Sequence, residues 1–346
     1  GLLDDETSAD IFTYSRNLYS TLEEETGLAT GFKSIGYLQI ACDTERLEEM
    51  RRSAAFMRNF GIDCHEIGLE EARSHWPNAK WDDVIGAFYT AEDGRANPVD
   101  VTMSLAKGFR QRGGTLVEGV RVTDVLEQQG QVTAVVTDHG TVETQFVVNC
   151  AGMWARQFGE LAGVSLPLQA AEHYYLITED MPGMTTTTPV LEDPDRYAYF
   201  REEVGGMMIG LFEPEAAPWN LDRIPDDFSF GEIDPDWERM IPFLESAYER
   251  VPEAKNLGIR KFFCGPESFT PDLAPLVGEA PVLRNYFVAC GMNSLGILSG
   301  GGVGRILAHW IVNGQPDVDV TGINVNRFHG CQANQHYLGD RLVEVL

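Results

Sequence analysis

Apolar residues recur at helical spacing in several parts of the chain, with polar residues at the positions between them. Between residues 8 and 26 the apolar positions Ile11, Leu18 and Leu22 lie on one helix face, and Gly27 then ends the predicted helix. The same pattern predicts further helices over residues 44–60, 69–76, 98–112, 154–162, 237–251 and 303–312.

Short runs of β-branched and aromatic residues between these helices predict strands. Residues 132–137 and 142–148 indicate a hairpin that turns at residues 138–140, and residues 146–152 indicate a buried strand ending on small residues. Further strands are predicted over residues 36–41, 88–89, 115–118, 121–127, 173–178, 197–201, 207–211 and 286–289.

The order of these elements indicates the fold class. Helices and strands alternate at both ends of the chain, whereas residues 167–263 contain strands separated by an acidic, proline-rich stretch. A parallel-sheet domain interrupted by an antiparallel-sheet domain fits this order, which makes the fold α/β with α+β. The length of 346 residues also favours two domains, because single hydrophobic cores rarely grow that large.

Composition excludes several classes of partner. The net charge of −27 repels phosphate backbones and anionic lipid surfaces, so nucleic-acid binding is not expected. The most apolar stretch, residues 286–312, is rich in glycine and contains Asn293, Arg305 and His309, so no membrane insertion is predicted. The six cysteines form no C-x-x-C pair and lack histidines at zinc spacing, which predicts reduced thiols, no metal site and a cytoplasmic or organellar-matrix protein.

The segment before the last predicted helix is the first candidate for ligand binding. Residues 291–297 (GMNSLGI) lead into a second glycine cluster at residues 300–304. Backbone N–H groups can approach a ligand there, and the N-terminus of the following helix favours negative charge. A complete G-x-G-x-x-G fingerprint is absent, because Arg305 or Leu307 takes the place of its last glycine.

Two other segments and two side chains are weaker candidates. Residues 148–154 (VNCAGMW) place small residues at the carboxyl end of a strand, where open α/β sheets bind ligands. Residues 265–272 (GPESFTPD) indicate a rigid loop, and each of these segments alone is equally typical of a structural turn. His173 and Tyr199 lie on predicted strands; a histidine can act as a base, although a lone one more often packs in a core or cleft. Hydrolase and kinase motifs are absent.

Taken together, the segments 148–154, 265–272 and 291–297 resemble the FAD-dependent D-amino-acid-oxidase-like superfamily, and within it the dimethylglycine and sarcosine dehydrogenases. The resemblance covers essentially the whole chain and is supported by residues 23–32 (EEETGLATGF), 93–98 (DGRANP) and 327–346. It implies a discontinuous FAD-binding domain of the GR2 type (residues 1–30, 98–166 and 263–312), an antiparallel-sheet substrate domain (31–97 and 167–262) and a C-terminal extension (313–346).

The resemblance also implies which residues bind FAD and which face the substrate. Val122 would lie beside the adenine, and the other expected cofactor-binding residues are Ala151, Gly152, Trp154, Gly265, Gly291, Met292, Asn293, Ser294, Gly296 and Ile297. His173 and Tyr199 match a histidine and a tyrosine that face the substrate in related oxidases. The implied reaction is hydride transfer from an N-methyl carbon of dimethylglycine or sarcosine to flavin N5.

Catalytic roles follow from the chemistry of this amine oxidation. His173 would accept the amine proton, and Tyr199 would hydrogen-bond to the substrate. A cation should meet the carboxylate of the small methylated amine, and Arg201 shares a sheet face with Tyr199 if no bulge intervenes. The electron acceptor would be oxygen or an electron-transfer flavoprotein.

Two departures from the family pattern accompany the resemblance. The strand and glycine fingerprint that first grip FAD are missing, as is the histidine, upstream of Gly1, through which several members attach FAD covalently. Many members continue into a folate-binding domain, but this sequence stops at Leu346, so we expect either a fragment of a longer protein or the companion of a separately supplied N-terminal piece. The alternatives are another amine or amino-acid oxidase of the superfamily, or a catalytically silent module. The expected location is the cytoplasm or, in a eukaryote, the mitochondrial matrix.

Overall fold

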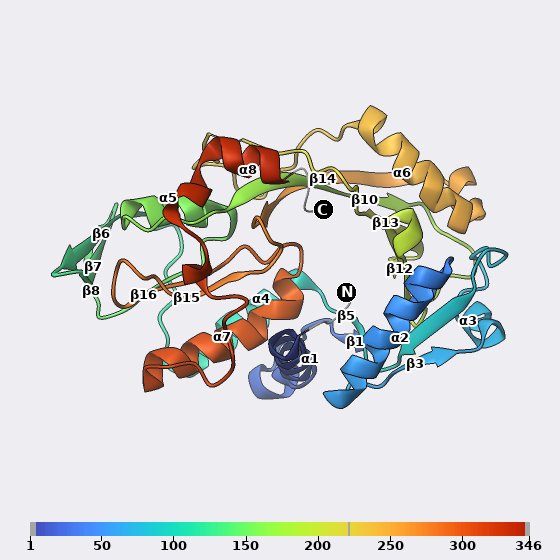
Figure 1. The fold of residues 1–346 in the computed structure, drawn as a ribbon, viewed down its shortest axis with the longest axis horizontal. Coiled ribbons are helices and arrows are strands. Elements are labelled where there is room, and N and C mark those ends of the chain that lie inside the picture. The colour runs from blue at the N-terminus through green and yellow to red at the C-terminus, as the bar shows by residue number, and fades with distance from the viewer. Residues whose placement is uncertain (1–4, 221, 343–346) are drawn as a thin grey trace.

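A computed structural model describes residues 5–220 and 222–342, and its largest element is an eight-stranded sheet (Figure 1). Every neighbouring pair of strands in this sheet is antiparallel except β11 and β2, which run parallel. In order across the sheet, its strands are β14 (Ile259–Phe269), β10 (Gln169–Thr178), β13 (Gly206–Leu211), β12 (Ala198–Glu203), β11 (Val190–Asp193), β2 (Tyr37–Ala41), β4 (Gly86–Thr90) and β3 (Cys64–Ile67).

Side-chain alternation gives this sheet one covered face and one open face. Tyr174 and Leu176 of β10 and Phe200 of β12 are fully buried in a core that also contains Leu244 of α6 (Trp237–Arg250). That core is therefore closed by α6, which packs on this face. The alternate residues of the same strands point to the other side of the sheet, where the candidate site lies.

A smaller sheet contains a parallel pair of strands. β16 and β9 run parallel, so their carboxyl ends meet at the same edge of the sheet. In order, its strands are β15 (Leu276–Glu279), β16 (Tyr286–Cys290) and β9 (Val147–Asn149). The other strands are β6 (Val122–Gln128), β7 (Gln131–Thr137), β8 (Gly140–Glu143), β1 (Lys33–Ser34) and β5 (Gly94–Arg95). Together the large antiparallel sheet and the α/β part confirm the predicted fold class.

The helices lie around these sheets (Figure 1). Besides α6 they are α1 (Glu6–Thr26), α2 (Thr44–Asn59), α3 (Leu69–His75), α4 (Pro98–Gln111), α5 (Ala155–Leu161), α7 (Gly296–Asn313) and α8 (Gln335–Leu342). Within the described ranges, no helix is both long enough and apolar enough to cross a bilayer. β14 crosses the predicted domain boundary at residue 263 as one continuous strand, and the division into two domains stays a prediction.

α1 and α7 lie side by side because α7 presents glycines where the two helices touch (Figure 1). A Cβ atom at Gly302 would lie 2.5 Å from the Cα of Ile11, and one at Gly301 would lie 3.0 Å from the Cα of Ser15. The Gly302 N–H donates to the Ser15 hydroxyl at 3.0 Å, and the Gly301 N–H donates to the Tyr19 hydroxyl at 3.2 Å. The close backbone contact and the hydrogen bonds therefore both depend on the absence of a side chain at Gly301 and Gly302.

Four predicted elements are wrong. Residues 265–269 of the rigid loop predicted over residues 265–272 lie in β14, because they pair with β10 in the large sheet. The last helix begins at Gly296 rather than at residue 303, because packing against α1 outweighs the poor helix propensity of glycine. Residues 115–118 form no strand, since no strand of the described chain pairs with them and their apolar side chains are exposed. The run 142–148 divides between β8 and β9, because the chain leaves the hairpin to pair with β16.

A buried ion network fastens α6 to the end of β11. Arg250 donates to the fully buried Asp193 at 2.7 Å and to Asp83 at 2.9 Å, and Arg196 forms ion pairs with both acids. Burial alone would raise the pKa of Asp83. Hydrogen bonds from Arg250 and Arg196 outweigh that effect and lower the pKa from 3.8 to about 2. The network therefore stabilises the fold most when its acids are ionised.

Two glycines of α7 test the helix contact. Gly302→Ala should lower the free energy of unfolding by about 1–3 kcal/mol, because the new methyl group meets the Ile11 backbone. Gly304→Ala is the matched control: it lies in the same helix, and a Cβ atom there would meet nothing within 4 Å apart from the neighbouring backbone of α7 itself, so the change should raise stability by about 0.5–1 kcal/mol. Urea unfolding measures both values, and equal effects of the two changes would contradict the packing.

Acid unfolding tests the ion network. Because the pKa of Asp83 is lowered, its stabilisation is complete above about pH 4 and is lost as the pH falls towards 2. Asp83→Asn should cost about 1 kcal/mol at neutral pH, a low value because Asp83 is 39% exposed, and should flatten the pH dependence of stability in that window. The control is Asp82→Asn, at a side chain that is 81% exposed; a similar change there would argue against the network.

Candidate active site

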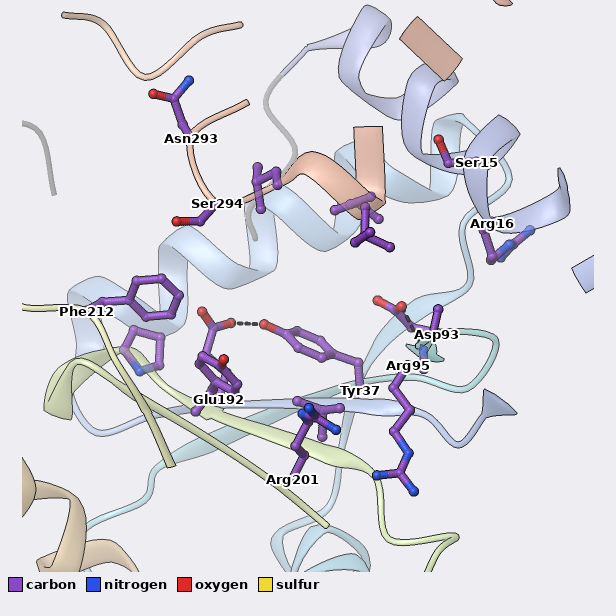
Figure 2. A pocket seen from close by; sticks show the side chains of 18 of the residues that line it. Ser15, Arg16, Tyr37, Asp93, Arg95, Glu192, Arg201, Phe212, Asn293 and Ser294 are labelled. Carbon is purple, nitrogen blue, oxygen red and sulfur yellow. Dashed lines mark hydrogen bonds between the residues drawn. The ribbon is translucent and has the colours of Figure 1, made fainter. Parts of the chain in front are cut away.

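A cavity of about 730 Å³ lies between the open face of the large sheet and the elements around the start of α7 (Figure 2). Pockets of this size can hold a flat ring system together with a small molecule. The residues that line it and carry the argument below are, on the sheet, Tyr37, Glu192, Tyr199 and Arg201, and, opposite, Tyr19, Asn293, Ser294 and Ile297.

Tyr199 lies on the sheet wall of the cavity. It is paired with Glu192 on one neighbouring strand and with Gly210 on the other, and a Cβ atom at Gly210 would lie 1.9 Å from the Tyr199 ring. The glycine therefore makes room for the tyrosine ring. Burial raises the pKa of Tyr199, partly opposed by Arg201, so the phenol stays protonated and can donate a hydrogen bond. The pairing continues without a bulge to Arg201, which confirms that the two residues share a face.

Glu192 is a cavity residue that the sequence analysis missed. Tyr37 donates its hydroxyl hydrogen to one carboxylate oxygen of Glu192, and the Gln39 amide donates to the same oxygen at 2.5 Å. Burial, together with the nearby Glu192 carboxylate, raises the pKa of Tyr37 well above its ordinary value, so Tyr37 remains a donor. Tyr37 and Gln39 alternate along one predicted strand, which indicated that they share a face. The strand that contains Glu192, β11, was not predicted, and Tyr37 and Gln39 are far from Glu192 in sequence.

Arginines near the cavity are already engaged by other acids. Arg201 pairs with Glu203 at 2.6 Å, and Arg95 pairs with the buried Glu202 at 2.5 Å. Arg95 belongs to the DGRANP segment, residues 93–98, and its pair with Glu202 attaches this part of the cavity rim to β12. Arg201 stands on the same face as Tyr199, so it is the cation best placed for an anionic group of a ligand.

The wall opposite the sheet is a loop in an unusual backbone conformation. Gly291, Asn293 and Ser294 have φ values of +65°, +47° and +65°, which non-glycine residues seldom adopt. The buried Asn293 side chain holds this shape: its oxygen accepts from the Thr270 N–H at 2.8 Å, and its nitrogen donates to the Gly291 carbonyl at 2.6 Å. Ser294 donates to the carboxylate of Glu267 on β14. Backbone strain of this kind is often concentrated at functional sites.

The N-terminus of α7 opens towards the cavity. Ile297 lines the cavity, and its carbonyl accepts a hydrogen bond from the Tyr19 hydroxyl at 2.7 Å. The first N–H groups of a helix have no acceptor within that helix, and the helix dipole adds partial positive charge there. This end of α7 therefore favours an electron-rich, carbonyl-bearing part of a ligand.

His173 lies behind the cavity wall rather than on it. Its ring packs 5.3 Å from the ring of Phe212, which does line the cavity and is itself 5.6 Å from the Tyr199 ring. His173 is 9% exposed, and its Nδ1 atom has no hydrogen-bond partner. A buried polar atom without a partner calls for an explanation, and a proton acceptor that waits for a ligand would provide one.

Most of the other predicted cofactor-binding residues lie outside the cavity lining. Ala151 and Gly152 follow β9 and Gly291 follows β16, so the carboxyl ends of the parallel strands bring them to one edge of the sheet. Trp154 donates its indole N–H to the Pro225 carbonyl at 3.0 Å. The residues outside the lining are Val122, Ala151, Gly152, Trp154, Gly265, Gly291, Met292 and Gly296, and their contact with a cofactor stays a prediction.

One group among the described residues has the composition of a metal site. Side-chain atoms of Cys42, Asp193 and Asp195 lie within 4.8 Å of one another. Arg250, however, already lies 3.2 Å from the Cys42 sulfur and 2.7 Å from Asp193. Burial, followed by the charge of Asp193, raises the pKa of the Cys42 thiol to about 12, so it stays protonated and is a poor ligand. The group is therefore part of the ion network.

The residues around the cavity fit the flavin that the motifs imply. The walls are rich in apolar and aromatic side chains, the α7 N-terminus faces the space, and the strained loop presents Asn293 and Ser294 to it. Nothing in this arrangement requires a phosphate-binding fingerprint, because the cavity would hold the ring end of the cofactor. The sheet edge at Ala151 and Gly152 would serve the remainder.

Comparison with known proteins identifies the family. The family described as FAD dependent oxidoreductase (DAO) matches residues 2–310. Mouse mitochondrial sarcosine dehydrogenase is 38% identical over 330 residues, which is 94% of this chain but 36% of that protein. The mouse mitochondrial pyruvate dehydrogenase phosphatase regulatory subunit is 36% identical over 337 residues, 96% of this chain and 38% of that protein. The chain thus spans well under half the length of these relatives.

Solved structures show the same fold. L-proline dehydrogenase from P. horikoshii matches with a TM-score of 0.83 and 25% identity over 94% of this chain and 84% of that one. Sequence motifs, family match and fold therefore agree, and the resemblance predicted from the three motifs is confirmed. The chain belongs to the DAO family of FAD-dependent oxidoreductases.

Proposed function

We propose that the chain forms the amine-oxidising part of an FAD-dependent enzyme that acts on small N-methylated amino acids such as sarcosine or dimethylglycine. The observation that carries this proposal is the cavity, in which Tyr199 and Arg201 face the N-terminus of α7 across a ring-sized space. The sarcosine dehydrogenase relative supports the choice of substrate. FAD, when bound, would accept a hydride from the N-methyl carbon of the substrate.

The side chains of the cavity have distinct tasks in this proposal. Arg201 binds the substrate carboxylate through N–H groups not used by Glu203, since a guanidinium has five donors. Tyr199 donates a hydrogen bond to the bound substrate from the sheet wall. His173 takes the proton of the amine at its unpaired Nδ1, which requires Phe212 to move aside.

Cofactor binding follows from the opposite wall. Asn293, Ser294 and Ile297 would contact the flavin ring, and the turn at Ala151 and Gly152 would contact the rest of the cofactor. The family resemblance also predicts covalent attachment of FAD, a folate-binding partner domain, and oxygen or an electron-transfer flavoprotein as the electron acceptor. These stay predictions. A cytoplasmic or mitochondrial-matrix location also stays a prediction.

A second candidate function is a catalytically silent regulatory module. It is favoured by the regulatory-subunit relative, whose name describes no redox activity and which is nearly as similar as sarcosine dehydrogenase. The two functions differ in whether the flavin, once bound, is reduced by an amine. A cavity with Tyr199 and Arg201 on one wall favours the enzyme.

Flavin reduction decides between these functions. Purified protein, reconstituted with FAD if colourless, should be yellow and should bleach without oxygen when sarcosine or dimethylglycine is added, as measured by absorbance near the flavin maximum. Trimethylglycine is the matched control, because its quaternary nitrogen has no electron pair with which to form an iminium ion. Bound flavin that no amine reduces would favour the silent module. Bleaching by other amines alone would reject the proposed substrate class.

Variants of the sheet face test the roles of Tyr199 and His173. Tyr199→Phe should slow flavin reduction about tenfold, and His173→Asn should slow it about 10²-fold and change its pH dependence, both with little loss of FAD affinity. Stopped-flow absorbance gives the rates. Tyr175→Phe is the control, since Tyr175 lies on the same face but stacks on Phe263 outside the cavity. Unchanged rates in His173→Asn would remove the proton acceptor from the proposal.

A further inference from the structure

We propose that Glu192 forms an anionic subsite that binds the positively charged nitrogen of a zwitterionic substrate, with Arg201 binding its carboxylate. This inference rests on the proposed function of the cavity and adds the charge pattern of the ligand. It concerns a residue to which the sequence motifs assigned no role.

The carboxylate of Glu192 is held in place by its neighbours. Tyr37 and Gln39 both donate hydrogen bonds to one of its oxygens, which fixes the position of the acid on the sheet face. Gln39 is 8% exposed, so its amide has little competing water. Glu192 therefore stands at a set place in the cavity wall.

In the described part of the chain, no arginine, lysine or histidine forms an ion pair with Glu192. The acids of β12 differ: Glu202 is paired with Arg95, and Glu203 is paired with Arg201. An unpaired carboxylate in a half-buried cavity is costly, and a cationic ligand would remove that cost. Asp93 also lines the cavity without an ion pair among the described residues, but Glu192 is the acid that lies beside Tyr199 on the sheet face.

Aromatic rings surround the carboxylate. Figure 2 shows Glu192 between Phe212 and Tyr37, with its carboxylate directed into the cavity. Tyr199 is its partner across the strand pair, and the rings of Tyr199 and Phe212 lie 5.6 Å apart. Aromatic faces attract cations, and rings around an anion favour methylated ammonium groups, which expose apolar methyls as well as charge. The surroundings thus favour an N-methylated nitrogen over a metal ion.

The spacing suits a small zwitterion. Glu192 is paired with Tyr199, and Arg201 lies two residues beyond it on the same face. Diagonal neighbours of this kind on a sheet have backbones about 7–8 Å apart, so two long side chains can hold the two ends of one small amino acid. FAD, when bound, would supply the hydride acceptor, and the Glu192 carboxylate would then lie near the nitrogen of the iminium product, whose positive charge it would stabilise.

Two ligands that cannot be oxidised separate the subsites. Trimethylglycine carries the quaternary nitrogen, whereas methoxyacetate has the same carboxylate and a neutral ether oxygen. Calorimetric titration of the FAD-loaded chain should show tighter binding of trimethylglycine. Glu192→Gln should weaken trimethylglycine at least about tenfold and methoxyacetate by less than about twofold. Arg201→Met should weaken both ligands alike.

Further variants distinguish a specific effect on the subsite from a general loss of charge or of folding. Glu203→Gln removes an equal charge from the same face, and it should leave the ratio of the two affinities unchanged. Tyr37→Phe keeps the ring but loses one donor to Glu192, so it should reduce the preference for trimethylglycine less than Glu192→Gln does. Circular dichroism melting would confirm that each variant folds.

The outcomes are distinct from those of the flavin experiment. Equal weakening of both ligands in Glu192→Gln, or no preference for trimethylglycine in the unaltered protein, would overturn the subsite. Absence of any trimethylglycine binding would do the same. Selective binding of trimethylglycine by a protein whose flavin is never reduced by amines would keep the subsite and reject the enzymatic function.

Discussion

Close contact between α1 and α7 is the constraint on which the candidate site depends. Gly302 allows the two helices to approach until no side-chain carbon fits between them, and Ser15 and Tyr19 then bind the backbone of α7. This contact makes a glycine-rich segment helical although glycine is a poor helix former. It also determines where the unsatisfied N–H groups at the start of α7 meet the cavity.

Strand register supplies the second half of the site. Tyr199, Arg201 and Glu192 face the cavity because each lies on the same side of the pleat, and Gly210 leaves space for the Tyr199 ring. On the other side the same strands bury apolar residues beneath α6. A shift of one residue in β12 would exchange Tyr199 for Phe200 and destroy both faces together. Burial of the large core on one face therefore also fixes which side chains lie on the open face.

Motifs and periodicity predicted the family, the fold class and the side of the sheet on which Tyr199 and Arg201 lie. They could not predict Glu192, because its partners on β2 are remote in sequence and β11 is too short for a period to be recognised. They also misplaced the start of α7, because helix propensity does not include the packing of α7 against α1. For His173, the family resemblance implied a position facing the substrate but gave no sign of the Phe212 ring that packs against it.

The hydrogen bond from the Thr270 backbone to Asn293 joins the loop before α7 to the end of β14. Because β14 is itself a strand of the large sheet, this hydrogen bond ties the loop on one wall of the cavity to the sheet that forms the other wall. In the proposed function, this connection would limit how far the two walls can separate. A longer amine would then extend along the sheet while a thicker one would be excluded, and selection would act on the cross-section of the molecule rather than on its length.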